Sequence, residues 1–161
     1  MTGRRKVSVF ATLVLAAEVF TAAVYLTVYR PVQLTDSAAE QQVVDVAGSA
    51  TVTLLSYGPQ TLDTDMRRAR SVMIGEFQTY YSKFTEEMVA PAVRDKGVKA
   101  SAQVVDSALM EIDPDTAKVL LFLNQETSSR DRPEPALTAS SVVVSLTKSG
   151  EDWLISALEP Q

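Results

Sequence analysis

A long apolar segment near the start of the chain limits what the sequence can fold into. Residues 7–29 read VSVFATLVLAAEVFTAAVYLTVY and contain one charged side chain, that of Glu18. A helix of about 20 mostly apolar residues is long enough to cross the hydrocarbon core of a bilayer. The segment therefore predicts a single transmembrane helix over residues 7–29.

Basic residues beside this segment predict its orientation. The run RRK immediately precedes it, whereas Arg30 alone follows it closely. Because basic flanks stay on the cytoplasmic side, we expect residues 1–6 in the cytoplasm, residues 30–36 as a linker, and residues 37–161 as a domain outside the plasma (inner) membrane. The alternative is a cleaved signal peptide, but its apolar region spans about 7 to 15 residues and is followed closely by a small-residue cleavage site.

Glu18 predicts a contact inside the membrane. A carboxylate near the bilayer centre costs about 2.5 to 3.5 kcal/mol unless it is paired or protonated. Ala11, Ala22 and Tyr25 share a helix face with it, and small residues beside a polar one allow membrane helices to pack closely. We interpret this face as docking onto another membrane protein or a second copy of the chain. A protonated Glu18 without a partner is the alternative.

The composition excludes several classes of function. The sequence contains no Cys and no His, and its formal net charge is −5 although its first 35 residues are net basic. Nucleic-acid binding needs a clustered basic face, which an acidic domain does not offer. The usual general base near neutral pH and the commonest zinc ligand are both missing. We therefore expect no cofactor, no metal and no nucleic-acid partner.

Helical periodicity covers the first half of the expected domain. Ser37 and Glu40 form a capping box, and apolar residues then recur at helical spacing until the Tyr57-Gly58-Pro59 breaker. A second amphipathic helix is expected over residues 62–73. A third follows Gly75, weakens at Pro91 and ends at Gly97.

The period changes to two from Val98 onward, which predicts strands. The alternation is disturbed at Val104-Val105-Asp106, where we expect a β-bulge. Further strands are expected over residues 117–127, 139–148 and 153–158, with the first of these three central in the sheet because it is apolar on both faces. Helices followed by antiparallel strands predict an α+β domain with helices on one face of a curved sheet.

Four segments together resemble the Mce-associated membrane proteins of mycobacteria and their relatives. They are SYGPQTLDTDMRRARSVMIGEF, VAPAVRDKGV, VLLFLNQETSS and WLISALEP. The resemblance implies an NTF2-like cone after a single anchor, with about three helices on a curved antiparallel sheet of about four strands. It also implies an accessory role beside Mce complexes, which move lipids or sterols across the envelope. The family often has an acidic residue where this chain has Gly58-Pro59, so no role for that acid carries over.

Two groups of side chains are candidates for binding. An aromatic set could line a pocket, although at helical spacing it is more typical of core; its members are Phe77, Tyr80, Tyr81, Phe84 and Met88. A basic set could contact an acidic partner or a lipid headgroup, although it is also typical of a solvated surface; its members are Arg67, Arg68, Arg70, Arg130 and Arg132. Asp63 and Arg67 are expected to form an i, i+4 pair.

The sequence favours a non-catalytic accessory or scaffold subunit that stabilises or positions an Mce-type lipid or sterol importer. Its expected partners are Mce transporter subunits, other Mce-associated proteins and membrane lipid. A membrane-tethered lipid-binding module is one alternative, and an isomerase-like enzyme is another. Acid-base candidates for the enzyme are Tyr57, Asp63, Asp65, Tyr80, Tyr81 and Asp106.

Overall fold

Helix α3 (Ser37–Leu55) begins the part of the chain that the computed structural model describes, residues 37–161. The predicted transmembrane helix, the linker, and the docking face of Glu18, Ala11, Ala22 and Tyr25 lie outside the described residues. Within residues 37–161, no helix has the length and apolar character needed to cross a bilayer.

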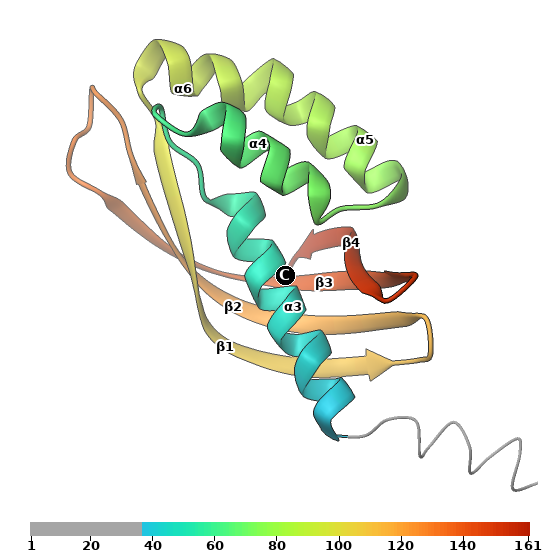
Figure 1. Ribbon diagram of the computed structural model, residues 1–161. Helices are drawn as coiled ribbons and strands as arrows, with labels where there is room; N and C mark the ends of the chain where they lie inside the picture. The colour runs from blue at the N-terminus through green and yellow to red at the C-terminus, as the bar shows by residue number, and fades with distance from the viewer. Residues whose placement is uncertain (1–36) are drawn as a thin grey trace, which may run out of the picture. The chain divides into compact units, whose positions relative to one another are not determined.

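The helices come first in the chain, as the periodicity predicts. Helix α3 crosses the concave side of the sheet, and the remaining helices run side by side beyond it (Figure 1). Three stretches of helix follow one another without a break after α4 and end at Gly97, which adopts a left-handed conformation with φ of 64°. The elements are α4 (Leu62–Ser71), α5 (Gly75–Phe84), the π turn η2 (Thr85–Val89) and α6 (Ala90–Lys96).

The four strands form one antiparallel sheet in the order β1-β2-β3-β4. Strand β2 is central, as its apolar sequence predicts, and it pairs with β3 without a register shift. The last three strands extend beyond their predicted ranges by one to three residues at each end, whereas the first begins one residue after Val98. The strands are β1 (Lys99–Ile112), β2 (Thr116–Ser128), β3 (Ala136–Ser149) and β4 (Asp152–Pro160).

Three register shifts bend the outer strands of the sheet. The predicted bulge is confirmed, because Val104 pairs with Leu123 and Asp106 with Phe122, which leaves Val105 without an opposing residue. A second bulge at Met110 and a third at Ser156 were not predicted. The extra residue lies on an edge strand in every case.

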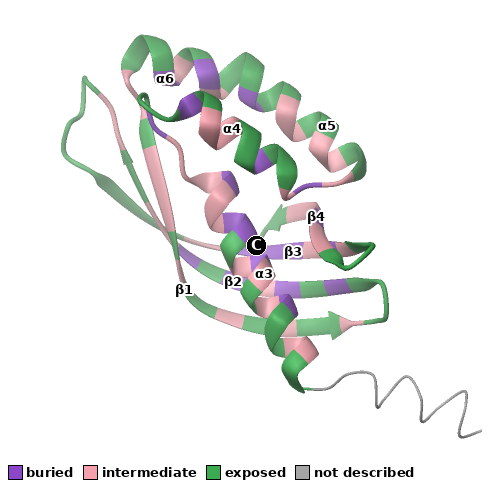
Figure 2. Cartoon of the chain, viewed as in Figure 1, coloured by how far each residue is buried: buried purple, intermediate pink, exposed green. Residues whose placement is uncertain are grey.

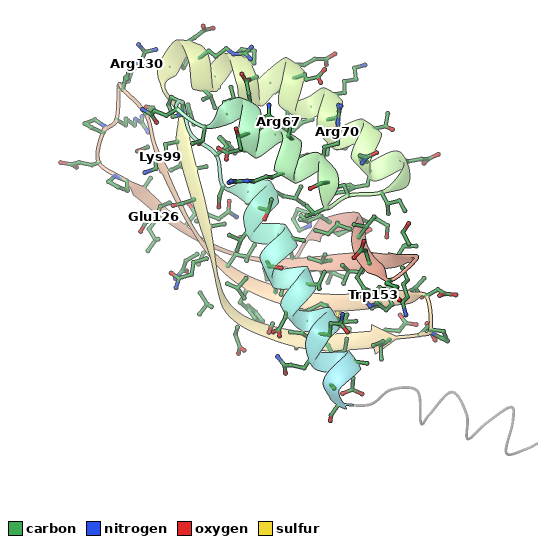
Figure 3. All side chains as sticks on the ribbon, viewed as in Figure 1. Arg67, Arg70, Lys99, Glu126, Arg130 and Trp153 are labelled. Carbon is green, nitrogen blue, oxygen red and sulfur yellow. The ribbon has the colours of Figure 1, made fainter. Side chains whose placement is uncertain are left out.

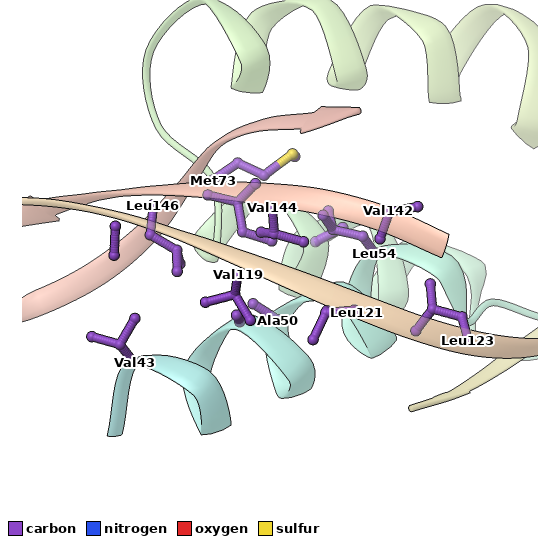
Figure 4. Packing of buried hydrophobic residues seen from close by; sticks show 14 residues of the cluster. Val43, Ala50, Leu54, Met73, Val119, Leu121, Leu123, Val142, Val144 and Leu146 are labelled. Atoms are coloured by element: carbon purple, nitrogen blue, oxygen red, sulfur yellow. The ribbon is translucent and has the colours of Figure 1, made fainter. Parts of the chain in front are cut away.

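The core lies between α3 and the concave face of the sheet (Figures 2 and 4). The alternation of strands β2 and β3 directs one set of side chains toward the helix, and the small residues of α3 allow a close approach. The side chains of this interface are 0 to 4% exposed, so they fill the concave side. They are Val43, Ala47, Ala50 and Leu54 of α3 with Val119, Leu121, Leu123, Val142, Val144 and Leu146 of the strands.

The two connections of α4 are hydrogen-bonded to opposite edges of the sheet. Before α4, Tyr57 exchanges backbone hydrogen bonds of 2.9 and 3.0 Å with Ala100 of β1. After α4, Ile74 N–H donates to the carbonyl of Ile155 in β4 at 3.0 Å, and Ile155 N–H donates to the carbonyl of Val72 at 2.9 Å. Helix α4 is thereby held at both ends.

Candidate interaction surface

The helices α5, η2 and α6 are continuous and are called the third helical segment below (residues 75–96). The aromatic set on this segment divides into a buried and an exposed part. Phe77 and Tyr81 are partly buried and pack against the core. Tyr80, Phe84 and Met88 are 67, 42 and 63% exposed, so core packing does not account for them. The Tyr80 and Phe84 rings lie nearly parallel, with centroids 6.5 Å apart. These three exposed residues are called the Tyr80 stripe below.

The π turn keeps the Tyr80 stripe straight. An α-helix turns by about 100° per residue, so every fourth residue is displaced around the axis by about 40°. From Phe84 to Met88 the chain winds instead as η2. In the wider i→i+5 turn, each residue rotates by a smaller angle about the helix axis. Met88 therefore returns toward the line of Tyr80, and the stripe runs along the helix rather than around it.

Two local features favour the π turn. Pro91 has no N–H to donate to the carbonyl of Glu87, and its ring crowds that turn. Thr85 Oγ1 lies 2.9 Å from the carbonyl oxygens of both Tyr81 and Ser82, and such bonds from a hydroxyl to the preceding turn bend helices. The weakening that Pro91 predicts is thus a change from α-helical to π-helical winding, and the helix continues through α6.

Among the acid-base candidates, Tyr57 and Tyr81 lie near each other. Burial raises the pKa of Tyr57, and burial together with nearby Tyr57 raises that of Tyr81 well above its ordinary value. Both phenols stay protonated near neutral pH. Asp65 Oδ2 accepts hydrogen bonds from Thr61 Oγ1 at 2.6 Å and from Gly58 N–H at 3.3 Å. Asp106 lies in β1, away from these tyrosines, where its carboxylate accepts a bond from the next backbone N–H.

The predicted pair of Asp63 with Arg67 is wrong. Asp63 lies 3.5 Å from Arg94 of α6 instead, and the Arg67 guanidinium donates to Thr64 Oγ1 at 3.1 Å. The packing of α6 beside the start of α4 brings a second arginine to Asp63, which spacing along one helix does not reveal. The pair is exposed and contributes little to stability.

Arg70, also on α4, is exposed (Figure 3). Arg70 lies 3.5 Å from Glu86 and donates to Ser82 Oγ at 3.3 Å, so it joins α4 to the third helical segment. Arg68 is exposed. These side chains form a solvated surface, and their use as a partner contact stays a prediction.

Arg130 holds the β2–β3 loop against the end of α6. Its guanidinium donates to the backbone carbonyls of Arg94, at 3.2 Å, and of Asp95, and its own N–H donates to Lys96 at 3.0 Å. A cation at a helix C-terminus satisfies carbonyls that have no partner in the helix. Arg132 is exposed, and its backbone N–H bonds to Ser129. The role of Arg130 as a candidate partner contact stays a prediction, and no pattern in the sequence indicates this capping role.

An open groove of about 460 Å³ is lined by residues of α3 and β1. Its apolar lining includes Val44, Val52 and Val104, and Gly48 brings the helix backbone close to the strand. In residues 37–161, no group of three or more acidic side chains is placed to hold a metal ion.

Relatives with curated names come from mycobacteria. The chain is 48% identical over 136 residues to uncharacterized protein Rv1362c of Mycobacterium tuberculosis, which covers 84% of this chain and 62% of that protein. The chain thus spans about three fifths of that relative's length. It is 38% identical over 122 residues to outer membrane protein Rv1973 of the same organism, and the match covers 76% of each chain. No model of a known protein family matches the sequence.

Solved structures share the fold at low sequence identity. An IcmL-like type IV secretion system protein of Legionella pneumophila has a TM-score of 0.64 at 13% identity, covering 75% of this chain and 91% of that one. VirB8 of Agrobacterium tumefaciens has a TM-score of 0.58 at 12% identity, covering 76 and 92%. An NTF2-like protein involved in plasmid conjugation has a TM-score of 0.51 at 9% identity, covering 76 and 48%.

These likenesses confirm the expected α+β fold, with three helical segments on a four-stranded antiparallel sheet of the NTF2-like and VirB8-like kind. At such identities they establish the fold alone. The match to Rv1973 is of another kind, because 38% identity extends over most of both sequences. The chain therefore belongs to the family of the mycobacterial outer membrane protein Rv1973.

Proposed function

We propose that this protein is a non-catalytic accessory subunit of a cell-envelope complex, and that the complex is an Mce-type importer of lipids or sterols. The observation that carries the accessory role is the filled concave face of the sheet. Leu54, Leu121 and Val144 at this face are 0% exposed, so their side chains occupy the space where a ligand would have to lie. Large apolar side chains are exposed on the outer helix and on strands β1, β2 and β3 instead, where a protein can reach them.

The names of similar proteins favour the envelope as the site of action. One family member is called an outer membrane protein, and two proteins with the same fold belong to type IV secretion. The residues before the domain add the expectation of a single-pass anchor in the plasma membrane with a cytoplasmic N-terminus. The Mce assignment depends on the sequence resemblance described above.

An isomerase-like enzyme has less support, because the candidates that lie near each other, Tyr57 and Tyr81, are both tyrosines with raised pKa, and neither can act as a base near neutral pH. Catalysis by general acid and base needs both groups within hydrogen-bond reach of one substrate. A lipid-binding module would have to use the groove beside α3, which is open to solvent, whereas lipid sites are concave and enclosed.

The accessory role is tested by purifying the tagged full-length chain from native membranes in mild detergent and identifying bound proteins by mass spectrometry. Glu18→Leu removes the carboxylate of the predicted docking face. Glu134→Leu makes the same chemical change at an exposed position of the β2–β3 loop and serves as the matched control.

We expect Mce transporter subunits with the unmodified chain and with Glu134→Leu, and a reduced yield with Glu18→Leu. Failure to recover Mce subunits with any version would contradict the Mce assignment. Equal recovery with all three would retain the complex and reject Glu18 as its contact. Stoichiometric lipid in the purified chain, without Mce subunits, would favour the lipid-binding alternative.

A further inference from the structure

Strand β3 is longer than its neighbour β4, so its first five residues form an open edge of the sheet. Strand β4 pairs with β3 only as far as Val142, and Gln161 N–H then donates to the carbonyl of Ser141 at 3.0 Å. Residues 136–140 pair with β2 on one side, and within residues 37–161 no strand pairs with their other side. In Figure 1 the chain end marked C lies near the middle of the sheet, whereas the β2–β3 hairpin continues beyond it. Residues 136–140 are called the β3 edge below.

The backbone of the β3 edge directs hydrogen-bonding groups toward this open side. In an antiparallel strand, the N–H and C=O of one residue point to the same side, and successive residues alternate. The carbonyl of Ser141 points toward β4, because it accepts the bond from Gln161. Strand β3 has no register shift against β2 in this stretch. The N–H and C=O groups of Leu137 and Ala139 therefore point away from β2, where no strand of residues 37–161 pairs with them.

The β3 edge lacks the features that usually prevent strand edges from pairing with other chains. Natural edges carry charged side chains, proline or β-bulges for this purpose. The β3 edge reads ALTAS, its first four residues are exposed, and it has no bulge. It can therefore accept a further strand. The charged residues of this end of the hairpin lie on β2 or in the loop; they are Glu126, Arg130, Asp131, Arg132 and Glu134.

The surrounding chain limits an incoming strand to five positions. At one end, Gln161 already lies opposite Ser141 and occupies the next place. At the other end, Pro135 would be the next residue to direct its N–H toward the open side, and proline has none. A partner strand must therefore be short and must end where this edge ends.

The β3 edge of a second copy meets these limits. In an antiparallel pair centred on Thr138, Leu137 of each copy lies opposite Ala139 of the other. These two residues carry the outward groups in both copies, so every outward N–H and C=O within the edge finds a partner. No charged residue lies in either paired segment. The loop before residue 136 comes from β2, on the far side of β3, so it leaves the open side free.

We propose that the β3 edge is a homodimer interface in which two copies join their sheets antiparallel across a twofold axis at Thr138. A twofold contact of this type is self-complementary, because the same surface of both subunits takes part. The two Thr138 side chains would form a cross-strand pair, a kind of contact that stabilises antiparallel strands. The proposal does not depend on the identity of the envelope complex.

A proline substitution separates pairing across the β3 edge from folding. Ala139→Pro removes an N–H that points away from β2, and edge strands tolerate proline in this orientation. Ala139→Ser keeps the N–H and is the matched control. We expect twice the chain mass for the natural full-length chain and for Ala139→Ser, purified in mild detergent and measured by light scattering. Ala139→Pro should have the single mass, with Trp153 fluorescence verifying that it is folded.

A cysteine at the axis tests the register, because the natural sequence has no Cys to compete. Facing residues that do not exchange hydrogen bonds have Cα atoms about 4.5 Å apart, within disulfide reach. We therefore expect Thr138→Cys in native membranes to form a species of twice the mass on mild oxidation. Thr127→Cys is the matched control, because Thr127 is also exposed but lies on β2. Its two copies would lie three strand spacings apart, at least about 14 Å, beyond the reach of about 7 Å.

A single mass for the natural chain would overturn the proposal. So would a doubled mass for folded Ala139→Pro, which would assign the dimer to another surface. Absence of the doubled species for folded Thr138→Cys would exclude an axis at this residue. Adducts of another mass with Thr138→Cys would show that a different protein adds its strand to the edge, and this result too would exclude the homodimer.

Discussion

The hydroxyl of Tyr81 donates a 2.6 Å hydrogen bond to the backbone carbonyl of Leu54. Leu54 lies in the last turn of α3, where carbonyl groups have no partner within their own helix. Because Tyr81 comes from α5, this bond joins the helix that fills the core to the helix that carries the exposed stripe.

Replacement of this tyrosine should destabilise the domain near neutral pH. Tyr81→Phe removes the hydroxyl and keeps the ring, so we expect the free energy of unfolding to fall by about 1 kcal/mol at pH 8. Urea denaturation of the full-length chain in detergent, followed by Trp153 fluorescence, measures the change. An unchanged free energy of unfolding would show that the bond has no net effect on stability.

The difference in the free energy of unfolding between the natural chain and Tyr81→Phe should become smaller at high pH. Burial, together with Tyr57, raises the pKa of Tyr81 above the ordinary tyrosine value of about 10. The unfolded chain loses the phenol proton first, so the contribution of Tyr81 is complete below about pH 10 and is lost as the pH rises toward the higher folded value. Denaturation at pH 8 and near pH 11 should show the advantage of the natural chain over Tyr81→Phe shrinking. A constant difference would contradict a raised pKa.

Arg130 should stabilise the domain through the end of α6. Arg130→Ala removes the bonds to the carbonyls of Arg94 and Asp95, and we expect a loss of about 1 to 2 kcal/mol in the free energy of unfolding. Arg132→Ala is the matched control in the same loop, and it should change stability by less than about 0.5 kcal/mol. Equal effects of the two substitutions would reject the capping role.

Gly97 and Arg130 should be energetically coupled. Gly97 has a φ of 64°, and an added Cβ would lie 2.9 Å from Cγ of Arg130. Gly97→Ala should therefore lower the free energy of unfolding by more than the roughly 1 kcal/mol that a left-handed alanine costs. The same substitution should have a smaller effect in a chain that also carries Arg130→Ala. A double-mutant cycle should give a coupling of about 0.5 kcal/mol or more. Additive effects would show that the arginine moves aside freely.

Core and surface leucines should differ sharply in their contributions. Leu121→Ala opens a cavity at a fully buried position of β2 and should lower the free energy of unfolding by about 2 to 5 kcal/mol. Leu137→Ala, at a position 65% exposed in β3, should change it by less than about 0.5 kcal/mol. A large effect at Leu137 in the full-length chain would instead identify a second covered surface.

Local patterns in the sequence predicted the elements because local physics determines them. The alternation after Val98 and its break at Val105 predicted both β1 and its first bulge. The bulge at Met110 was not predicted, because Ala108, Met110 and Ile112 keep the period of two and leave no change of phase to detect. Pro91 indicated a weakened helix, but the sequence does not say whether the chain kinks, ends or winds more widely there.

Contacts between distant segments account for what the sequence did not reveal at the surface. Arg130 reaches a carbonyl 36 positions earlier in the chain, and no spacing rule connects a hairpin loop with a helix end. Asp63 finds Arg94 for the same reason. The helical spacing grouped Tyr80 with Tyr81, and the packing of α5 alone decides that Tyr81 turns inward and Tyr80 outward.

The placement of the three bulges on β1 and β4 has a consequence for how copies of this domain can associate. Extra residues at Val105, Met110 and Ser156 interrupt the rows of N–H and C=O groups that an incoming strand would need, and the chain flanking α4 already occupies part of both rows. Edges interrupted in this way resist templated growth of the sheet. The domain is therefore suited to closed assemblies of defined size and is protected from open-ended fibres when many copies crowd together.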